Sequence, residues 1–74
     1  MNKYTEEMTF VQHNINKAQS LSEIINIIHQ YNWISQTKSG GLIALEDQGA
    51  SLSYLKAQAN KMVAFYAEKR QSVH

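Results

Sequence analysis

The sequence predicts an all-α fold, a small bundle of three principal helices, and three observations support that prediction. Apolar residues recur at alternating steps of three and four near each end of the chain, which is the spacing of one helix face. The chain contains no proline that would interrupt a helix. Its three glycines all lie between positions 40 and 49. We therefore expect helices over about residues 3–18, 21–34 and 50–70, with the clearest irregular zone around the glycines.

The helix predicted over 3–18 is defined by one apolar stripe. Glu6 and Glu7 lie in its first turns, where negative charge interacts favourably with the helix dipole. We expect it to end near Gln19, because the segment 20–23 has the Ser-x-x-Glu pattern of a capping box that starts the next helix. The stripe consists of Tyr4, Met8, Val11, Ile15 and Ala18.

The helix predicted over 21–34 has a broad apolar face, which indicates an element that packs on two sides. The four isoleucines of the run 24–28 also favour a strand. The capping box and the length of the apolar pattern favour the helix. Trp33, the only tryptophan, is expected to anchor the end of this helix to the core.

The segment 42–47 allows two interpretations. Gln36 to Gly41 is expected to form a loop. After it, residues 42–47 form either a short helical turn with Leu42 and Leu45 facing inward, or a hairpin strand paired with residues 33–36. Alanine, leucine and glutamate favour the helix, and an isolated hairpin is marginally stable.

The helix predicted over 50–70 is the longest element, at about 30 Å. It follows Gly49, and Lys69 and Arg70 lie in its last turn, where positive charge is favourable. Its apolar stripe consists of Leu52, Leu55, Ala59, Met62 and Tyr66.

Size and composition limit the classes of function. A chain of 74 residues forms a single helical domain over 1–74, with a small core. There is no cysteine, net charge is +1 and charged residues are only 18%, so strong attraction to nucleic acid or anionic lipid is not expected. No apolar run is long enough to span a bilayer, and the N-terminus lacks the apolar segment of a signal peptide. We expect a cytoplasmic protein without a membrane partner.

No pattern of catalytic or metal-binding residues is present. His13, His29 and His74 lack a second ligand at helical spacing, and a metal site needs three or four converging ligands. Glu46 and Asp47 are adjacent, so on a helix they diverge by about 100°. The serines lack a nucleophile elbow, and the glycine pair after Ser39 lacks the rest of a phosphate-binding loop. We therefore expect no enzyme activity, cofactor or metal.

Contact with another protein is the leading functional hypothesis. Phe10, Tyr54 and Phe65 lie about 120° from the centres of the apolar stripes, where a helical core leaves them near the surface. Exposed aromatic residues mark interfaces, although a wide core could also absorb them. Ala57 belongs to an alanine series on the side of the last helix opposite its stripe, where another helix could approach closely, although alanine is also the commonest residue to fill a helix surface.

These residues predict a protein–protein interaction module, a small regulator, inhibitor or adaptor that binds through a helical face. Its partner-binding residues are expected to be Phe10, Tyr54, Ala57 and Phe65. Because the chain is small and has two long stripes, a homodimer through the helix over 50–70 is a further hypothesis.

A small nucleic-acid-binding or transcription-regulating protein is the alternative. The helix over 50–70 carries basic residues interspersed with aromatic ones. It also carries Glu68, and nucleic-acid-binding modules concentrate more positive charge than this chain has. The basic residues are Lys56, Lys61, Lys69 and Arg70.

Overall fold

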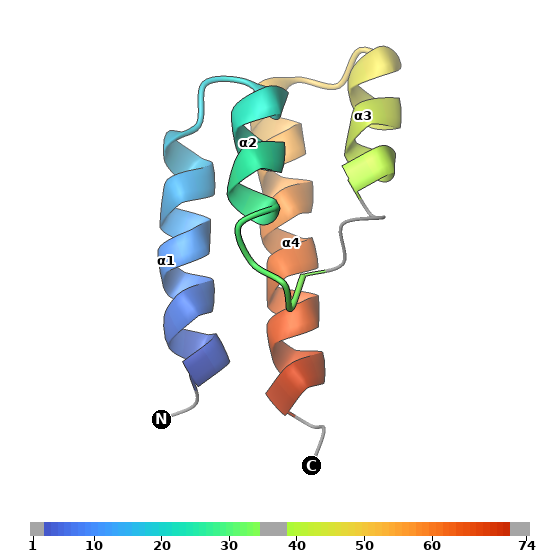
Figure 1. Ribbon diagram of the computed structural model, residues 1–74. Coiled ribbons are helices and arrows are strands. Elements are labelled where there is room, and N and C mark those ends of the chain that lie inside the picture. The colour runs from blue at the N-terminus through green and yellow to red at the C-terminus, as the bar shows by residue number, and fades with distance from the viewer. Residues whose placement is uncertain (1–2, 35–38, 72–74) are drawn as a thin grey trace.

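Four helices form the part of the chain that the structure describes. The computed structural model describes residues 3–34 and 39–71, with side chains for 4–34 and 39–69. The helices are α1 (Lys3–Lys17), α2 (Leu21–Ile28), α3 (Ser39–Asp47) and α4 (Leu52–Gln71), and no strand occurs within the described ranges. Consecutive helices run in opposite directions (Figure 1), in a body of 39 × 21 × 17 Å. The predicted all-α bundle is confirmed, with four helices in place of three plus a short turn.

The junction between α1 and α2 has the predicted capping chemistry. The Ser20 hydroxyl accepts a hydrogen bond from the Glu23 backbone N–H at 3.2 Å. The Glu23 carboxylate accepts one from the backbone N–H of Gln19 at 3.1 Å. This reciprocal pair satisfies backbone donors at the start of α2. It sets the short connection from which α2 turns back along α1 (Figure 1).

The second helix is shorter than the predicted range of 21–34. It ends at Ile28, with His29 as its C-cap. Beyond that point the backbone N–H of Gln30 bonds to the Ile27 carbonyl and that of Tyr31 to the Ile28 carbonyl, so the chain tightens into i→i−3 turns. The apolar pattern continues past Ile28, but in a non-helical segment.

That segment attaches the end of α2 to α1 through Trp33, as the sequence predicts for this residue. Trp33 is buried, and its indole Nε1 donates a hydrogen bond to Glu7 Oε1 at 2.9 Å. Tyr4 and Tyr31 meet the Trp33 ring edge-on, with ring centroids 5.8 and 6.1 Å away. The indole thus buries its ring and satisfies its only polar atom, which is the usual arrangement for a core tryptophan.

The segment 42–47 is helical, and its helix begins earlier than predicted. Ser39 to Gly41 form the first turn of α3, so the expected loop is wrong at 39–41; its residues 36–38 lie outside the described ranges. Leu42 is buried, which fastens α3 to the bundle. Gly49 adopts φ +92° after the last turn, a left-handed conformation in which glycine avoids the penalty of a Cβ.

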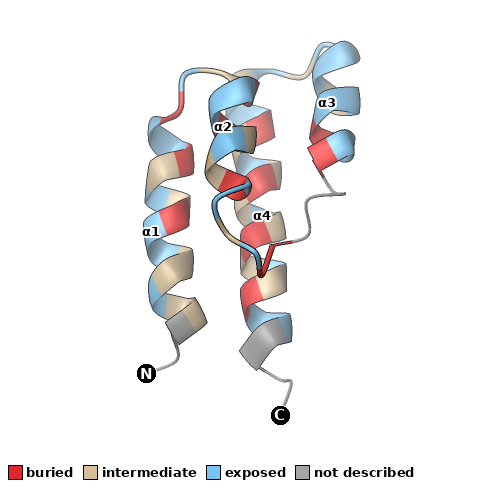
Figure 2. Cartoon of the chain, viewed as in Figure 1, coloured by how far each residue is buried: buried red, intermediate tan, exposed pale blue. Residues whose placement is uncertain are grey.

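The core lies between the helices, along their inward faces (Figure 2). Val11 and Ile15 of the predicted first stripe are fully buried. On α4 the fully buried row is Leu55, Ala59, Val63 and Ala67, stepping by four. The sequence pattern missed Val63 and Ala67 because α4 packs on α1, α2 and α3 together, so its apolar surface is wider than one stripe.

The remaining stripe residues of α4 are only partly covered. Leu52, Met62 and Tyr66 are intermediate in exposure and pack at the edge of the core. The helix therefore has a buried row and an incompletely covered row. In the described residues, no helix has the length and hydropathy needed to cross a membrane.

Candidate functional site

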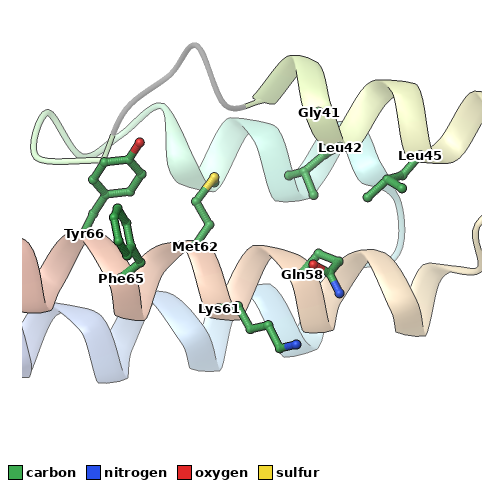
Figure 3. A pocket seen from close by; sticks show the side chains of 8 residues that line it. All are labelled: Gly41, Leu42, Leu45, Gln58, Lys61, Met62, Phe65 and Tyr66. Atoms are coloured by element: carbon green, nitrogen blue, oxygen red, sulfur yellow. The ribbon is translucent and has the colours of Figure 1, made fainter.

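A groove of about 380 Å³ lies between α3 and α4. Leu42 and Leu45 point from α3 toward α4, and Met62 points from α4 toward α3 (Figure 3). The lining is mostly apolar, which is typical of a surface that binds an apolar partner. The lining residues are Gly41, Leu42, Leu45, Gln58, Lys61, Met62, Phe65 and Tyr66.

The groove exists because α3 covers only part of α4. α3 has 9 residues and α4 has 20, so the shorter helix leaves part of its neighbour uncovered. Gly41 has no side chain to narrow the groove, and a Cβ built there meets no atom within 4 Å. Met62 and Tyr66 are therefore left half-buried at a position where a longer or bulkier α3 would cover them.

One wall of the groove is aromatic. Phe65 is 59% exposed although it is among the largest apolar residues of the chain. Its ring meets that of Tyr66 edge-on, with centroids 5.2 Å apart and an interplanar angle of 81°. Such a contact orients the Phe65 ring without burying it. An exposed, oriented aromatic ring beside an apolar groove is the arrangement found at interaction hot spots.

The polar part of the lining is small. Lys61 is the single charged residue among those that line the groove, and it has no hydrogen-bond or ion-pair partner within the described part of the chain. Gln58, one turn earlier on α4, supplies an amide with both a donor and an acceptor. The groove can thus bind apolar side chains and accept a hydrogen-bonding or acidic group at Lys61.

The structure places two of the four predicted contact residues on one face. Phe65 lines the groove, and Tyr54, 48% exposed, lies one turn before the lining residue Gln58. Ala57 is exposed but is not a lining residue. Phe10 is 60% exposed on α1, which contributes no lining residue, so any contact at Phe10 is separate from the groove.

The two central lysines of α4 do not form a common basic face. Lys56 Nζ donates a hydrogen bond to the backbone carbonyl of Asn16 on α1 at 2.8 Å. Lys61 is exposed and lines the groove, with its side chain directed away from α3 (Figure 3). Five residues separate them, which on a helix corresponds to about 140°. Positive charge on α4 is therefore divided between opposite sides.

A polar contact joins the end of α2 to the start of α3. Ser39 Oγ lies 3.5 Å from His29 Nε2, and Ser39 is only 6% exposed. The buried hydroxyl is not open to a substrate, so we interpret the contact as structural. Among the described residues, no three histidine, aspartate or glutamate side chains are placed to hold a metal ion.

Several groove residues were not among the predicted contacts. The sequence places Met62 and Tyr66 on the apolar stripe and Lys61 among the basic residues of the same helix. The available signal was the spacing of Tyr54, Gln58, Lys61 and Phe65, which step by four, three and four along one side of α4. Comparison with protein-family models, curated proteins and solved structures found no significant match to this chain.

Proposed function

We propose that this chain is a non-enzymatic protein–protein interaction module, a small regulator, inhibitor or adaptor, that receives an amphipathic helix of its partner in the groove between α3 and α4. The observation that carries the proposal is Phe65, held by Tyr66 at the groove wall yet 59% exposed. An aromatic ring in that position is not part of the core, and a partner that covers it buries its exposed apolar surface.

A helix is the element that best fits this surface. The groove lies between α3 and α4. These two helices run antiparallel (Figure 1), and a third helix laid along such a pair buries residues at i, i+3, i+4 and i+7. Leu45, Met62 and Phe65 supply apolar contacts in sequence along it. Lys61 and Gln58 at its polar part would discriminate between partners, because an apolar residue placed there leaves them unpaired.

The distribution of charge supports this proposal over the nucleic-acid alternative. Net charge is +1, and Lys56 and Lys61 lie on different sides of α4. A protein that binds the phosphate backbone gathers its cations on one face. Among the described lining residues, the one charged side chain, Lys61, stands instead among mostly apolar side chains.

Affinity capture with two matched variants tests the proposal. Phe65→Ala and Phe10→Ala remove the same side chain at nearly equal exposure, 59% and 60%, from different faces. Each protein, and the unmodified chain, is immobilised and exposed to a lysate of the native host, and retained proteins are quantified by mass spectrometry. We expect at least one protein to be retained by the unmodified chain and by Phe10→Ala but lost with Phe65→Ala.

The expected loss is at least about tenfold in affinity, the effect of truncating an interface hot spot. Retention that is equal for all three proteins would contradict the groove as the contact surface. Retention lost only with Phe10→Ala would move the contact to α1.

A further inference from the structure

The outward row of α4, beside the groove, consists of Tyr54, Gln58, Lys61 and Phe65. The positions of this row are symmetric about its midpoint. Tyr54 and Phe65 are equally distant from the point between Ala59 and Asn60, and Gln58 and Lys61 are equally distant from the same point. All four lie within about 60° around the helix axis. If two such helices pack antiparallel about a two-fold axis at that point, the same four side chains meet each other from both sides.

We infer that the helix received by the groove is α4 of a second copy of this chain, packed antiparallel. This rests on the proposed function, because it names the occupant of the same groove. In this register Tyr54 of each copy lies against the partner's Phe65, and it extends the aromatic wall that Phe65 and Tyr66 form. The interface is isologous, so it closes after two copies.

The polar groups are complementary in the same register. Lys61 faces the partner's Gln58, whose amide oxygen can accept a hydrogen bond from the ammonium group. Neither of the two Lys61–Gln58 pairs sets two like charges directly opposite each other. In the parallel register Lys61 would face the partner's Lys61, which is unfavourable. The row thus favours one orientation over the other.

Charges at the two ends of α4 also favour the antiparallel arrangement. Lys69 lies near its C-terminal end, four residues after Phe65 on the same side. Glu46 and Asp47 are exposed at the end of α3, next to the start of α4. Antiparallel packing brings Lys69 of each copy toward the partner's Glu46 and Asp47, so this pairing of opposite charges occurs twice per dimer, while the neighbouring Glu68 carries a negative charge.

The available surface is sufficient only if α3 takes part. A small specific interface buries roughly 600 Å² per partner, about one eighth of the 4794 Å² accessible surface of this chain. α4 is about 30 Å long and a single helix face is about 10 Å wide, so α4 alone supplies about half of that area. The α3 side of the groove must supply the rest.

Sedimentation equilibrium tests the oligomeric state. The monomer mass is 8.5 kDa, and we expect the unmodified chain and Phe10→Ala to approach twice that value as concentration rises. Each dimer contains two Tyr54–Phe65 contacts, so Phe65→Ala should raise the dissociation constant about 100-fold, tenfold for each contact. A monomer mass for the unmodified chain at all concentrations would overturn the second-copy assignment.

Cysteine pairing tests the register, since the chain has no cysteine of its own. Tyr54→Cys mixed with Phe65→Cys should form a disulfide-linked dimer, whereas either variant alone should not. In the antiparallel register the two copies of position 54, or of position 65, are 11 residues apart along the axis, about 16 Å, which is beyond disulfide reach. Self-linked dimers of each variant alone would show a parallel arrangement and overturn the antiparallel one.

The outcomes separate this inference from the proposed function. If the chain is monomeric but Phe65→Ala still abolishes capture of a host protein, the groove remains the contact surface. Only the second copy as its occupant is then overturned. If the chain is monomeric and Phe65→Ala changes the capture of no host protein, both the second-copy inference and the proposed function are overturned.

Discussion

Two positions on α4 that are two residues apart should differ in how much their truncation lowers the free energy of unfolding. Val63 is fully buried and Phe65 is 59% exposed, although both are apolar. Replacing each with alanine therefore removes a core side chain in one case and a surface side chain in the other. The pair distinguishes the face of α4 that holds the fold from the face that we assign to binding.

The magnitudes follow from burial. Val63→Ala removes two buried methyl equivalents at about 0.8 kcal/mol each and leaves a cavity, so the free energy of unfolding should fall by about 2 to 3 kcal/mol. Phe65→Ala loses the edge contact with Tyr66 but gains helix propensity, so its loss should stay below about 1 kcal/mol. For a domain of this size, Val63→Ala should lower Tm by roughly 10–20 °C.

Urea denaturation followed by far-UV circular dichroism measures both values. It should be done at low micromolar concentration, because association stabilises the folded state by mass action. If Phe65→Ala lowers the unfolding free energy as much as Val63→Ala does, Phe65 belongs to the core and its assignment as a contact residue fails. If Val63→Ala changes stability by less than about 0.5 kcal/mol, the packing of α4 is not as described.

Two further substitutions test how the chain between helices is held. Trp33→Phe should lower the unfolding free energy by about 2 kcal/mol, because it removes the indole donor to Glu7 and some buried volume. Glu7→Gln keeps an acceptor for the indole and should lower the unfolding free energy by less. Equal losses of stability in the two variants would contradict this role of the indole. Gly49→Ala should lower the unfolding free energy by about 1 kcal/mol, as measured by thermal unfolding. The cause is the backbone φ of +92°, since the added Cβ meets no atom within 4 Å. An unchanged Tm would mean that the turn relaxes to another conformation.

The helical fold class was predictable from apolar spacing and capping, but the end of α2 was not. Tyr31 and Ile34 continue the apolar spacing beyond Ile28, and no glycine or proline marks the end of the helix there. What ends the helix is tertiary: Trp33 is buried against α1 and bonds to Glu7. A single sequence carries no local signal for that contact.

The start of α3 was obscured by its two glycines. Glycine disfavours helix, so Gly40 and Gly41 predicted a loop. Burial of Ser39 and Leu42 against the bundle outweighs that preference, since tertiary packing routinely overrides propensity. Gly41 also leaves one position on the α3 side of the groove without a side chain.

The binding face was only partly predictable. The angular positions of Tyr54 and Phe65 indicated that they lie outside the core, and both are exposed. The groove itself required knowing where α3 packs, because Leu42 and Leu45 line its α3 side. A helical wheel places residues around one helix and says nothing about which neighbour is too short to cover it.

The most direct test of the groove as the contact surface is amide chemical-shift mapping by ¹H–¹⁵N NMR. Spectra of the labelled chain are recorded over a dilution series, and again with a captured partner where one is found. The shifts that change should cluster in α3 at 41–45 and in α4 at 54–66, while the amides around Phe10 on α1 stay fixed. Changes that centre on Phe10, with the groove amides unmoved, would contradict the account.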